Sequence, residues 1–227
     1  MDKYQYLLEL YKLKFLGYEY IDESIVNRIL LRPCKIQSLN LPNNYSQLYK
    51  FVQNCTLCDF YKTKKNLIFG SDYINQQILI MFIGDYPGVI EDESGDIFSS
   101  KSAYTLTQMI TNVLNLNLKD IYYTHILKCK PSNTIISVSQ VESCLDYLHA
   151  QIAIIKPKLI VTLGEFSLKT LYLEDASFKI LRGQKLKYKR NDVEINMIPT
   201  FDPAFLIKNP SAKKDAMQDL EIIKSML

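Results

Sequence analysis

Three short apolar runs stand out against the more polar remainder of the chain. They have the length of strands, and two of them end in glycine, which is typical of buried strands in α/β proteins. The runs lie at 77–84, 120–127 and 158–164. Residues 178–200 instead alternate between apolar and polar positions, which predicts a β-hairpin with its turn at 190–192.

Helical periodicity fills most of the chain between and after these strands. The helical segments are expected at 101–116, 137–155, 164–173 and 211–227, with Ser137 as a plausible N-cap of the second. Strands that alternate with helices predict an α/β fold of three layers (α/β/α), with a central, mainly parallel, four-stranded sheet. In such a sheet the ligand site lies at the carboxyl ends of the strands. One functional edge is therefore expected to carry the loops 84–98, 125–134, 164–166 and 200–208.

The N-terminal part of the chain predicts two or three more helices without recognisable chemistry. We expect a helical extension over residues 1–50 and one main domain over 51–227, because a chain of 227 residues usually forms a single large domain. No apolar run reaches the roughly 18 residues of a membrane span. The start of the chain mixes charge and tyrosine into its apolar pattern and makes a poor signal peptide. We therefore expect a cytoplasmic monomer that does not contact membranes.

Charge is weakly informative in total and more informative in its distribution. The net charge is +3, which permits an acidic partner without requiring one. Six basic residues fall within 179–190 with no acid among them, and three lysines lie within 62–65. Such clusters can neutralise phosphates, or they can form a solvated face.

Five cysteines occur in a chain without an export signal, so structural disulfides are not expected. Cys55 and Cys58 form a C-x-x-C pair, which can hold one metal from a single turn. Cys129 and Cys144 follow much later, and Cys34 stands apart. The spacing alone leaves a zinc site, an iron–sulfur site and no metal site open.

Seven motifs follow one another in a recognisable order between about residues 52 and 227. They are CTLCDFYKTKKNLIFG (55–70), IGDYPGVIEDESGDIF (83–98), THILKCKP (124–131), SCLDYL (143–148), PKLIVTLG (157–164), LRGQ (181–184) and DPAFLIKN (202–209). In this order the chain resembles the iron–sulfur, family 4 uracil-DNA glycosylases. The resemblance implies a DNA partner that carries a damaged base. It also implies a structural [4Fe-4S] cluster, with Cys55, Cys58, Cys129 and Cys144 as its ligands.

The resemblance also assigns roles in the loop after the first strand. Asp85 matches the family's acidic residue, with Asp in place of Glu, and would orient water and favour a cationic sugar; a loop-capping Asp is the alternative. Tyr86, Pro87 and Gly88 would shape the base pocket. Glu91 matches the first residue of the family's acidic pair and Asp92 the second, unless both are solvated loop charges. Phe98 matches the aromatic residue that stacks on uracil, unless it is an ordinary core residue.

Two pocket positions depart from the family pattern. His125 stands where the family has Asn, and Asp202 stands where it has the His that donates to the departing base. Asp202 could be protonated by burial, or it could pair with His125. Arg182 and Lys208 match basic family residues and would contact DNA. We therefore predict a DNA N-glycosylase that removes uracil or another altered base. The alternative is a DNA-binding or lesion-binding protein that has lost catalysis but keeps the fold and the cluster.

Overall fold

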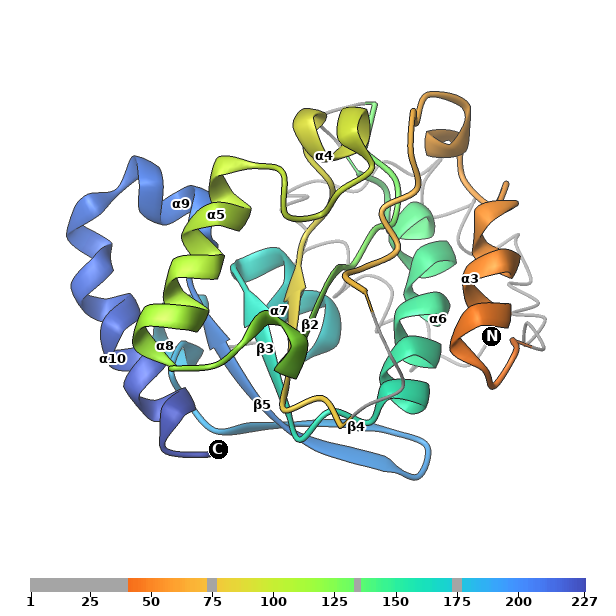
Figure 1. Cartoon of the computed structure of the whole chain (residues 1–227). Coiled ribbons are helices and arrows are strands. Elements are labelled where there is room, and N and C mark those ends of the chain that lie inside the picture. Colours follow the sequence, from red (N-terminus) through yellow and green to blue (C-terminus); the bar gives the residue numbers. More distant parts are fainter. Residues whose placement is uncertain (1–40, 73–76, 133–135, 173–176) are drawn as a thin grey trace, which may run out of the picture.

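The computed structural model describes residues 41–72, 77–132, 136–172 and 177–227 (Figure 1). The helices predicted before residue 41 lie outside these residues. Helix α3 (Tyr45–Gln53) begins after Asn44, whose side chain accepts hydrogen bonds from two amides of its first turn. The helix spans the predicted boundary between residues 50 and 51, which stays a prediction. Leu48 and Val52 of α3 are buried in the core of the main domain.

A five-stranded sheet forms the centre of the protein. Its strand order is β2-β1-β3-β5-β4, with β4 antiparallel to β5 and the other pairings parallel. The strands are β1 (Ile80–Gly84), β2 (Ile121–His125), β3 (Leu159–Leu163), β4 (Leu186–Arg190) and β5 (Val193–Thr200). The three predicted strands and the hairpin are confirmed. The predicted number of four strands is wrong, because both strands of the hairpin join the sheet.

Two details of the predicted hairpin and helices differ in the structure. The start of the predicted hairpin is a short helix, α8 (Phe178–Leu181), and the strands turn at Asn191, which has a left-handed φ of 50°. The helix predicted at 101–116 is α5 (Lys101–Gln108) followed by the π-helical turn η2 (Met109–Val113). Ser137 caps α6 (Val138–Ile155) as predicted, since its hydroxyl accepts the Gln140 amide.

Helices flank the sheet, as the alternation of elements predicted. On β1, Met81 and Ile83 face one apolar cluster while Ile80 and Phe82 face the other. The first cluster includes residues of α3, α6 and α7 (Glu165–Leu171), and the second includes residues of α5, α9 (Pro203–Lys208) and α10 (Lys213–Lys224). Figure 1 shows α3 and α6 on one side of the strands and α5 and α10 on the other.

The remaining elements are short helical turns that connect these layers. They are η1 (Asp59–Lys62), α4 (Val89–Ser94), η3 (Leu118–Asp120) and η4 (Pro210–Ala212). None of the helices in the described ranges is both long and apolar enough to cross a membrane.

A close approach between Gly70 and Tyr122 joins the segment after the cysteine pair to the sheet. Tyr122 of β2 is fully buried, and its hydroxyl contacts the Tyr45 hydroxyl at 2.9 Å and accepts a hydrogen bond from Gln151 Nε2 at 2.8 Å. A Cβ atom on Gly70 would lie only 2.1 Å from the Tyr122 hydroxyl oxygen. Any side chain at position 70 would therefore displace this buried ring.

Replacing Gly70 with Ala is expected to destabilise the protein by about 1–3 kcal/mol, the usual cost of overpacking a well-filled core. Urea unfolding measures the change. Gly88→Ala is the matched control, because the nearest atom to an added Cβ there is 3.8 Å away. Equal unfolding free energies for the two variants would contradict the prediction.

Candidate active site and cysteine pocket

The carboxyl ends of the parallel strands bring together the two predicted catalytic residues and one predicted substrate-binding residue. Asp85 directly follows β1, His125 ends β2, and Asp202 lies two residues after β5. Gly164 follows β3 with a φ of 96°, and a Cβ atom there would lie 3.3 Å from Asp202 Cβ and 3.9 Å from Asp85 Oδ1. The absence of a side chain at Gly164 thus lets the two carboxyl groups lie close to each other.

Asp85 is held by the start of helix α7. The Ser167 amide, one of the free donors in the first turn of α7, donates to Asp85 Oδ1 at 3.1 Å. The pKa of Asp85 is raised to about 7, mainly by burial and in addition by the nearby charge of Asp202, while the hydrogen bonds from Ser167 act in the opposite direction. A carboxyl group with this pKa exchanges protons readily near neutral pH, which suits a general base.

Asp202 is the N-cap of α9. Its Oδ1 accepts the Ala204 amide, and burial raises its pKa, although the amides of Ala204 and Phe205 and the charge of His125 act in the opposite direction. The predicted partnership between Asp202 and His125 is not among the hydrogen bonds of the described residues. The predicted protonation of Asp202 stays a prediction.

The ring of His125 lies beside Glu91 instead. His125 Nε2 is 3.5 Å from Glu91 Oε2, and neither ring nitrogen has a hydrogen-bond partner among the described residues. Glu91 is fixed by the Gly88 amide at 2.8 Å and by the Ser100 hydroxyl at 3.0 Å. Burial alone would raise the pKa of Glu91, but His125 and these donors lower it overall. At 3% exposed, Glu91 is not the solvated loop charge that was its alternative.

Asp92, the second acid of the pair, is also buried, and it forms hydrogen bonds with two residues of another segment. Its Oδ1 accepts the amides of Lys65 and Asn66 at 2.9 and 3.2 Å, and its carbonyl oxygen accepts Asn66 Nδ2 at 2.7 Å. These bonds attach α4 to the segment that follows the cysteine pair. The solvated reading of Asp92 is therefore wrong as well, since only 1% of the residue is exposed.

Three rings form a row from the loop before α5 to the end of β2. The ring centroids of Phe98 and Tyr123 are 5.7 Å apart, and those of Tyr123 and His125 are 5.0 Å apart. Sequence reasoning missed Tyr123, although it lies two residues before His125 on a strand and so shares its face. It also missed Ser167, for which the sequence carries no signal because the contact joins segments 82 residues apart.

The neighbouring loop residues are more exposed. Tyr86 is 45% exposed, and its ring centroid is 6.3 Å from that of Phe166. Pro87 is buried, and Gly88 is the exposed N-cap of α4. The Gly88 amide donates a hydrogen bond to the carboxylate of Glu91, so this amide already has an acceptor within the loop.

The basic residues predicted to contact DNA differ in their surroundings. Arg182 forms ion pairs with Asp219 and Asp215, lies over the ring of Phe201, and has a side chain that is 16% exposed. Its charge is therefore balanced within the protein. Lys208, at the end of α9, is exposed.

Much of the predicted basic stretch belongs to β4. Lys187 and Lys189 pair with Glu194 of β5, and Arg190 pairs with Asp146 of α6. These side chains are mostly exposed, while Tyr188 between them is buried. The stretch is thus a charged strand with internal carboxylate partners.

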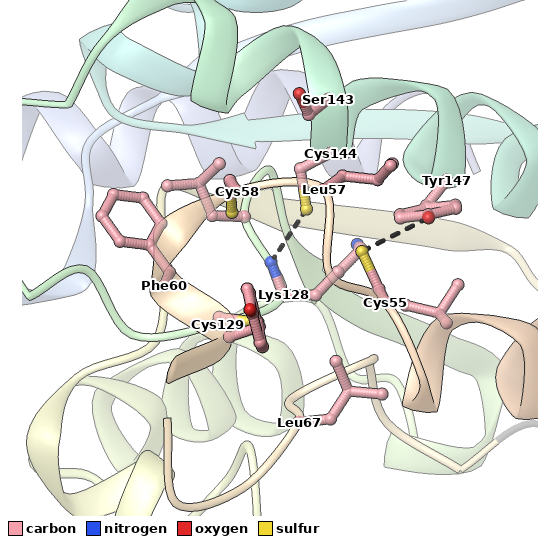
Figure 2. Close-up of a pocket in the computed structure, with 13 residues that line it drawn as sticks. Cys55, Leu57, Cys58, Phe60, Leu67, Lys128, Cys129, Ser143, Cys144 and Tyr147 are labelled. Atoms are coloured by element: carbon pink, nitrogen blue, oxygen red, sulfur yellow. Dashed lines mark hydrogen bonds between the residues drawn. The ribbon is translucent and has the colours of Figure 1, made fainter. Parts of the chain in front are cut away.

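Four cysteines surround one pocket, as Figure 2 shows. Cys55 and Cys58 come from the loop between α3 and η1, Cys129 follows β2, and Cys144 belongs to α6. All four are free thiols. Their neighbours are mostly apolar, but the Tyr147 hydroxyl donates to Cys55 Sγ and the amide of Lys128 donates to Cys144 Sγ, both at 3.4 Å.

The chemistry of this donor set suits a polynuclear cluster. Burial raises the pKa of Cys129 to about 11 and that of Cys144 to about 12, so both remain thiols at neutral pH unless a metal stabilises the thiolate. Among the described residues no group of three or more potential ligands is close enough to hold a single metal ion. A [4Fe-4S] cluster is held by four thiolates on different irons, so it can use ligands that are farther apart.

Lys128 connects this pocket to the candidate active site. It is 1% exposed, and its Nζ donates to Thr124 Oγ1 at 2.7 Å and to the His125 carbonyl at 2.6 Å. Its amide reaches Cys144, and its carbonyl accepts the Ile68 amide at 2.9 Å. One buried residue thus contacts a cysteine, the end of β2 and the segment after the cysteine pair.

Comparison with known proteins gives a consistent set of relatives. The family model described as the uracil DNA glycosylase superfamily matches residues 71–221. A type-4 uracil-DNA glycosylase from Sulfurisphaera tokodaii is 33% identical over 180 residues, which cover 77% of this chain and 81% of that protein. Type-4 uracil-DNA glycosylases from Saccharolobus solfataricus and Archaeoglobus fulgidus are 32% and 30% identical, over 78% and 76% of this chain and 83% and 87% of theirs.

Replacing Asp92 with Ala is expected to lower the free energy of unfolding by on the order of 2 kcal/mol, because it removes the shared acceptor of two partly buried amide hydrogen bonds. Urea unfolding measures the loss. Glu93→Ala serves as the control, since Glu93 forms an exposed pair with Lys65, and exposed pairs contribute little. An equal loss of unfolding free energy in Glu93→Ala would contradict the prediction that Asp92 stabilises the fold as the acceptor of the two amides.

Proposed function

Because the chain belongs to the type-4 uracil-DNA glycosylase family, we propose that it hydrolyses the N-glycosidic bond of uracil or another altered base in DNA. The observation that carries this proposal is Asp85. It is a partly buried carboxyl group with a pKa of about 7, held at the carboxyl edge of the sheet by an amide of α7. General-base chemistry at neutral pH needs a group of this kind.

The reaction takes the base out of the DNA stack and into the protein. As the bond between base and sugar breaks, its electron pair leaves with the base and the sugar becomes cationic. Ionised Asp85 favours this cation and accepts a proton from the water that attacks the sugar. The products are a free base and an abasic site.

The remaining site residues are assigned to the base. Phe98 stacks on its face, and His125 offers ring nitrogens that the described residues leave without hydrogen bonds. Glu91 holds the His125 ring, and the turn of Tyr86, Pro87 and Gly88 borders the opening. Lys208, which is exposed, contacts a DNA phosphate as a point charge. Arg182 is held by its ion pairs with Asp215 and Asp219, so its role in DNA binding is to position neighbouring residues.

Cys55, Cys58, Cys129 and Cys144 are proposed to hold a [4Fe-4S] cluster. This is supported by the pocket that they share and by the family of the chain. When bound, the cluster would cross-link three segments of the chain. It would take no part in the chemical steps of base excision.

A second function is favoured by one observation at Asp202. An ionised Asp202 lacks the hydrogen that the family's His would donate to the departing base, and its carboxylate is already engaged as a helix cap. A protein that binds altered bases in DNA without excising them would tolerate this change. Excision assays distinguish the two functions directly.

Asp85→Asn is expected to reduce uracil excision by roughly 10²- to 10⁴-fold, the range over which general acid–base groups act. The assay uses a single-stranded oligonucleotide and a duplex with U opposite G, followed by alkaline cleavage of abasic sites. Binding of the same DNA should persist.

The stability of Asp85→Asn provides the control for folding. The pKa of Asp85 is higher in the folded protein than in the unfolded chain. The free energy of unfolding of wild type therefore falls as pH rises from the unfolded-state pKa of this carboxyl group to about 7. The variant should therefore unfold at a higher temperature than wild type at pH 8. Wild-type protein that binds uracil-containing DNA without cutting it would favour the second function.

Asp202→Asn is expected to shift the acidic limb of the rate profile to lower pH. Excision needs the ionised form of Asp85, so the wild-type rate should rise as pH passes about 7. Removing the charge of Asp202 lowers the pKa of Asp85, while Asn still caps α9. Single-turnover excision rates measured between about pH 5 and 9 give the pH at which the rate rises. If this pH is the same for wild type and Asp202→Asn, the charge of Asp202 does not raise the pKa of Asp85.

A further inference from the structure

The three lysines that follow the C-x-x-C pair differ in their surroundings. Lys62 Nζ lies 2.7 Å from Asp59 Oδ1 and Lys65 Nζ lies 2.7 Å from Glu93 Oε1, on side chains that are 60% and 64% exposed. Lys64 Nζ is instead buried without a hydrogen-bond partner, and no carboxylate pairs with it in the described part of the chain. The middle lysine is therefore directed into the protein.

A buried ammonium group without a partner is costly, so its surroundings call for negative charge. The Lys64 amide donates to the Phe60 carbonyl at 3.0 Å, which folds the residue back onto the turn that begins at Cys58. Phe60 lines the cysteine pocket together with Cys58 and Cys129. Lys64 thus lies beside the cysteine pocket.

We propose that Lys64 is the internal counter-ion of the iron–sulfur cluster. The inference rests on the cluster of the proposed function, since four thiolates on a [4Fe-4S] core leave it with net negative charge. Charge and hydrogen bonding around a cluster set its stability and its reduction potential. The ammonium of Lys64 lowers the cost of that negative charge, and the cluster in turn neutralises a cation that otherwise has no partner.

The neighbouring lysines differ from Lys64, because each has hydrogen-bond or ion-pair partners among the described residues. Lys128 also lines the cysteine pocket, but two of the three donors of its ammonium group already bind Thr124 Oγ1 and the His125 carbonyl. Lys62 and Lys65 are exposed and paired with acids. The buried Nζ of Lys64 does not reach the surface, so this lysine is not placed to bind a DNA phosphate.

The test compares Lys64→Met with Lys62→Met and Lys65→Met in protein purified without oxygen. Iron and sulfide content establish first whether the wild-type protein carries the cluster. The loss of visible absorption in excess chelator, and the midpoint potential in the absence of DNA, are then measured for each variant. Lys64→Met should lose its cluster about 10- to 100-fold faster than wild type, with a lower midpoint potential, while both control variants match wild type.

Lys64→Arg keeps the charge and should restore the wild-type rate and potential, and Lys64→Gln provides a second uncharged variant should Lys64→Met not fold. A wild-type protein without iron would overturn the cluster of the proposed function itself. A wild-type cluster that is equally stable in all three lysine variants would overturn only the part assigned to Lys64. A weaker salt dependence of DNA binding in Lys64→Met, with an unchanged cluster, would make Lys64 a phosphate contact and also overturn it.

Discussion

The parallel register of the central strands is the constraint on which the candidate site depends. Gly84 of β1 lies opposite His125 of β2, and a Cβ at Gly84 would lie 2.7 Å from His125 Nδ1. The ring can occupy this place only because position 84 has no side chain. In the same sheet β3 ends at Leu163, and Gly164 follows it next to Asp85 and Asp202. Pairing between strands far apart in sequence thus sets the distances between groups that no local rule brings together.

Two sets of buried hydrogen bonds connect this edge to the cysteine pocket. Lys128 links Cys144 to the backbone of His125, and Asp92 links α4, which carries Glu91, to the segment after the cysteine pair. The hydrogen bonds of Lys128 are buried and those of Asp92 are partly buried, which limits the exchange of these groups with solvent. A cross-link at the cysteines would therefore restrain the residues of the site without taking part in the chemistry.

The sequence predicted the parts of this structure that follow from local patterns. Apolar runs ending in glycine marked β1 and β3, and the rule for parallel sheets predicted the edge that carries Asp85 and Asp202. The fifth strand was missed because the pairing of β4 within the sheet is a tertiary property of the hairpin. The burial of Glu91 and the contact from Ser167 were missed for the same reason: both arise between segments distant in the chain. A lysine run looks uniform in sequence, and only packing separates Lys64 from its neighbours.

The charges on β4 have a consequence for how copies of the protein meet one another. Among the described residues β4 is the last strand of the sheet, and one side of its backbone has no strand partner within them. Unpaired strand edges attract the edges of other molecules and begin aggregation, and lysine side chains along an edge oppose this. Lys187, Lys189 and Arg190 line this edge, and their partial neutralisation by Glu194 and Asp146 holds them in place. The stretch that suggests nucleic-acid binding in the sequence thereby also keeps the sheet from growing beyond its own chain.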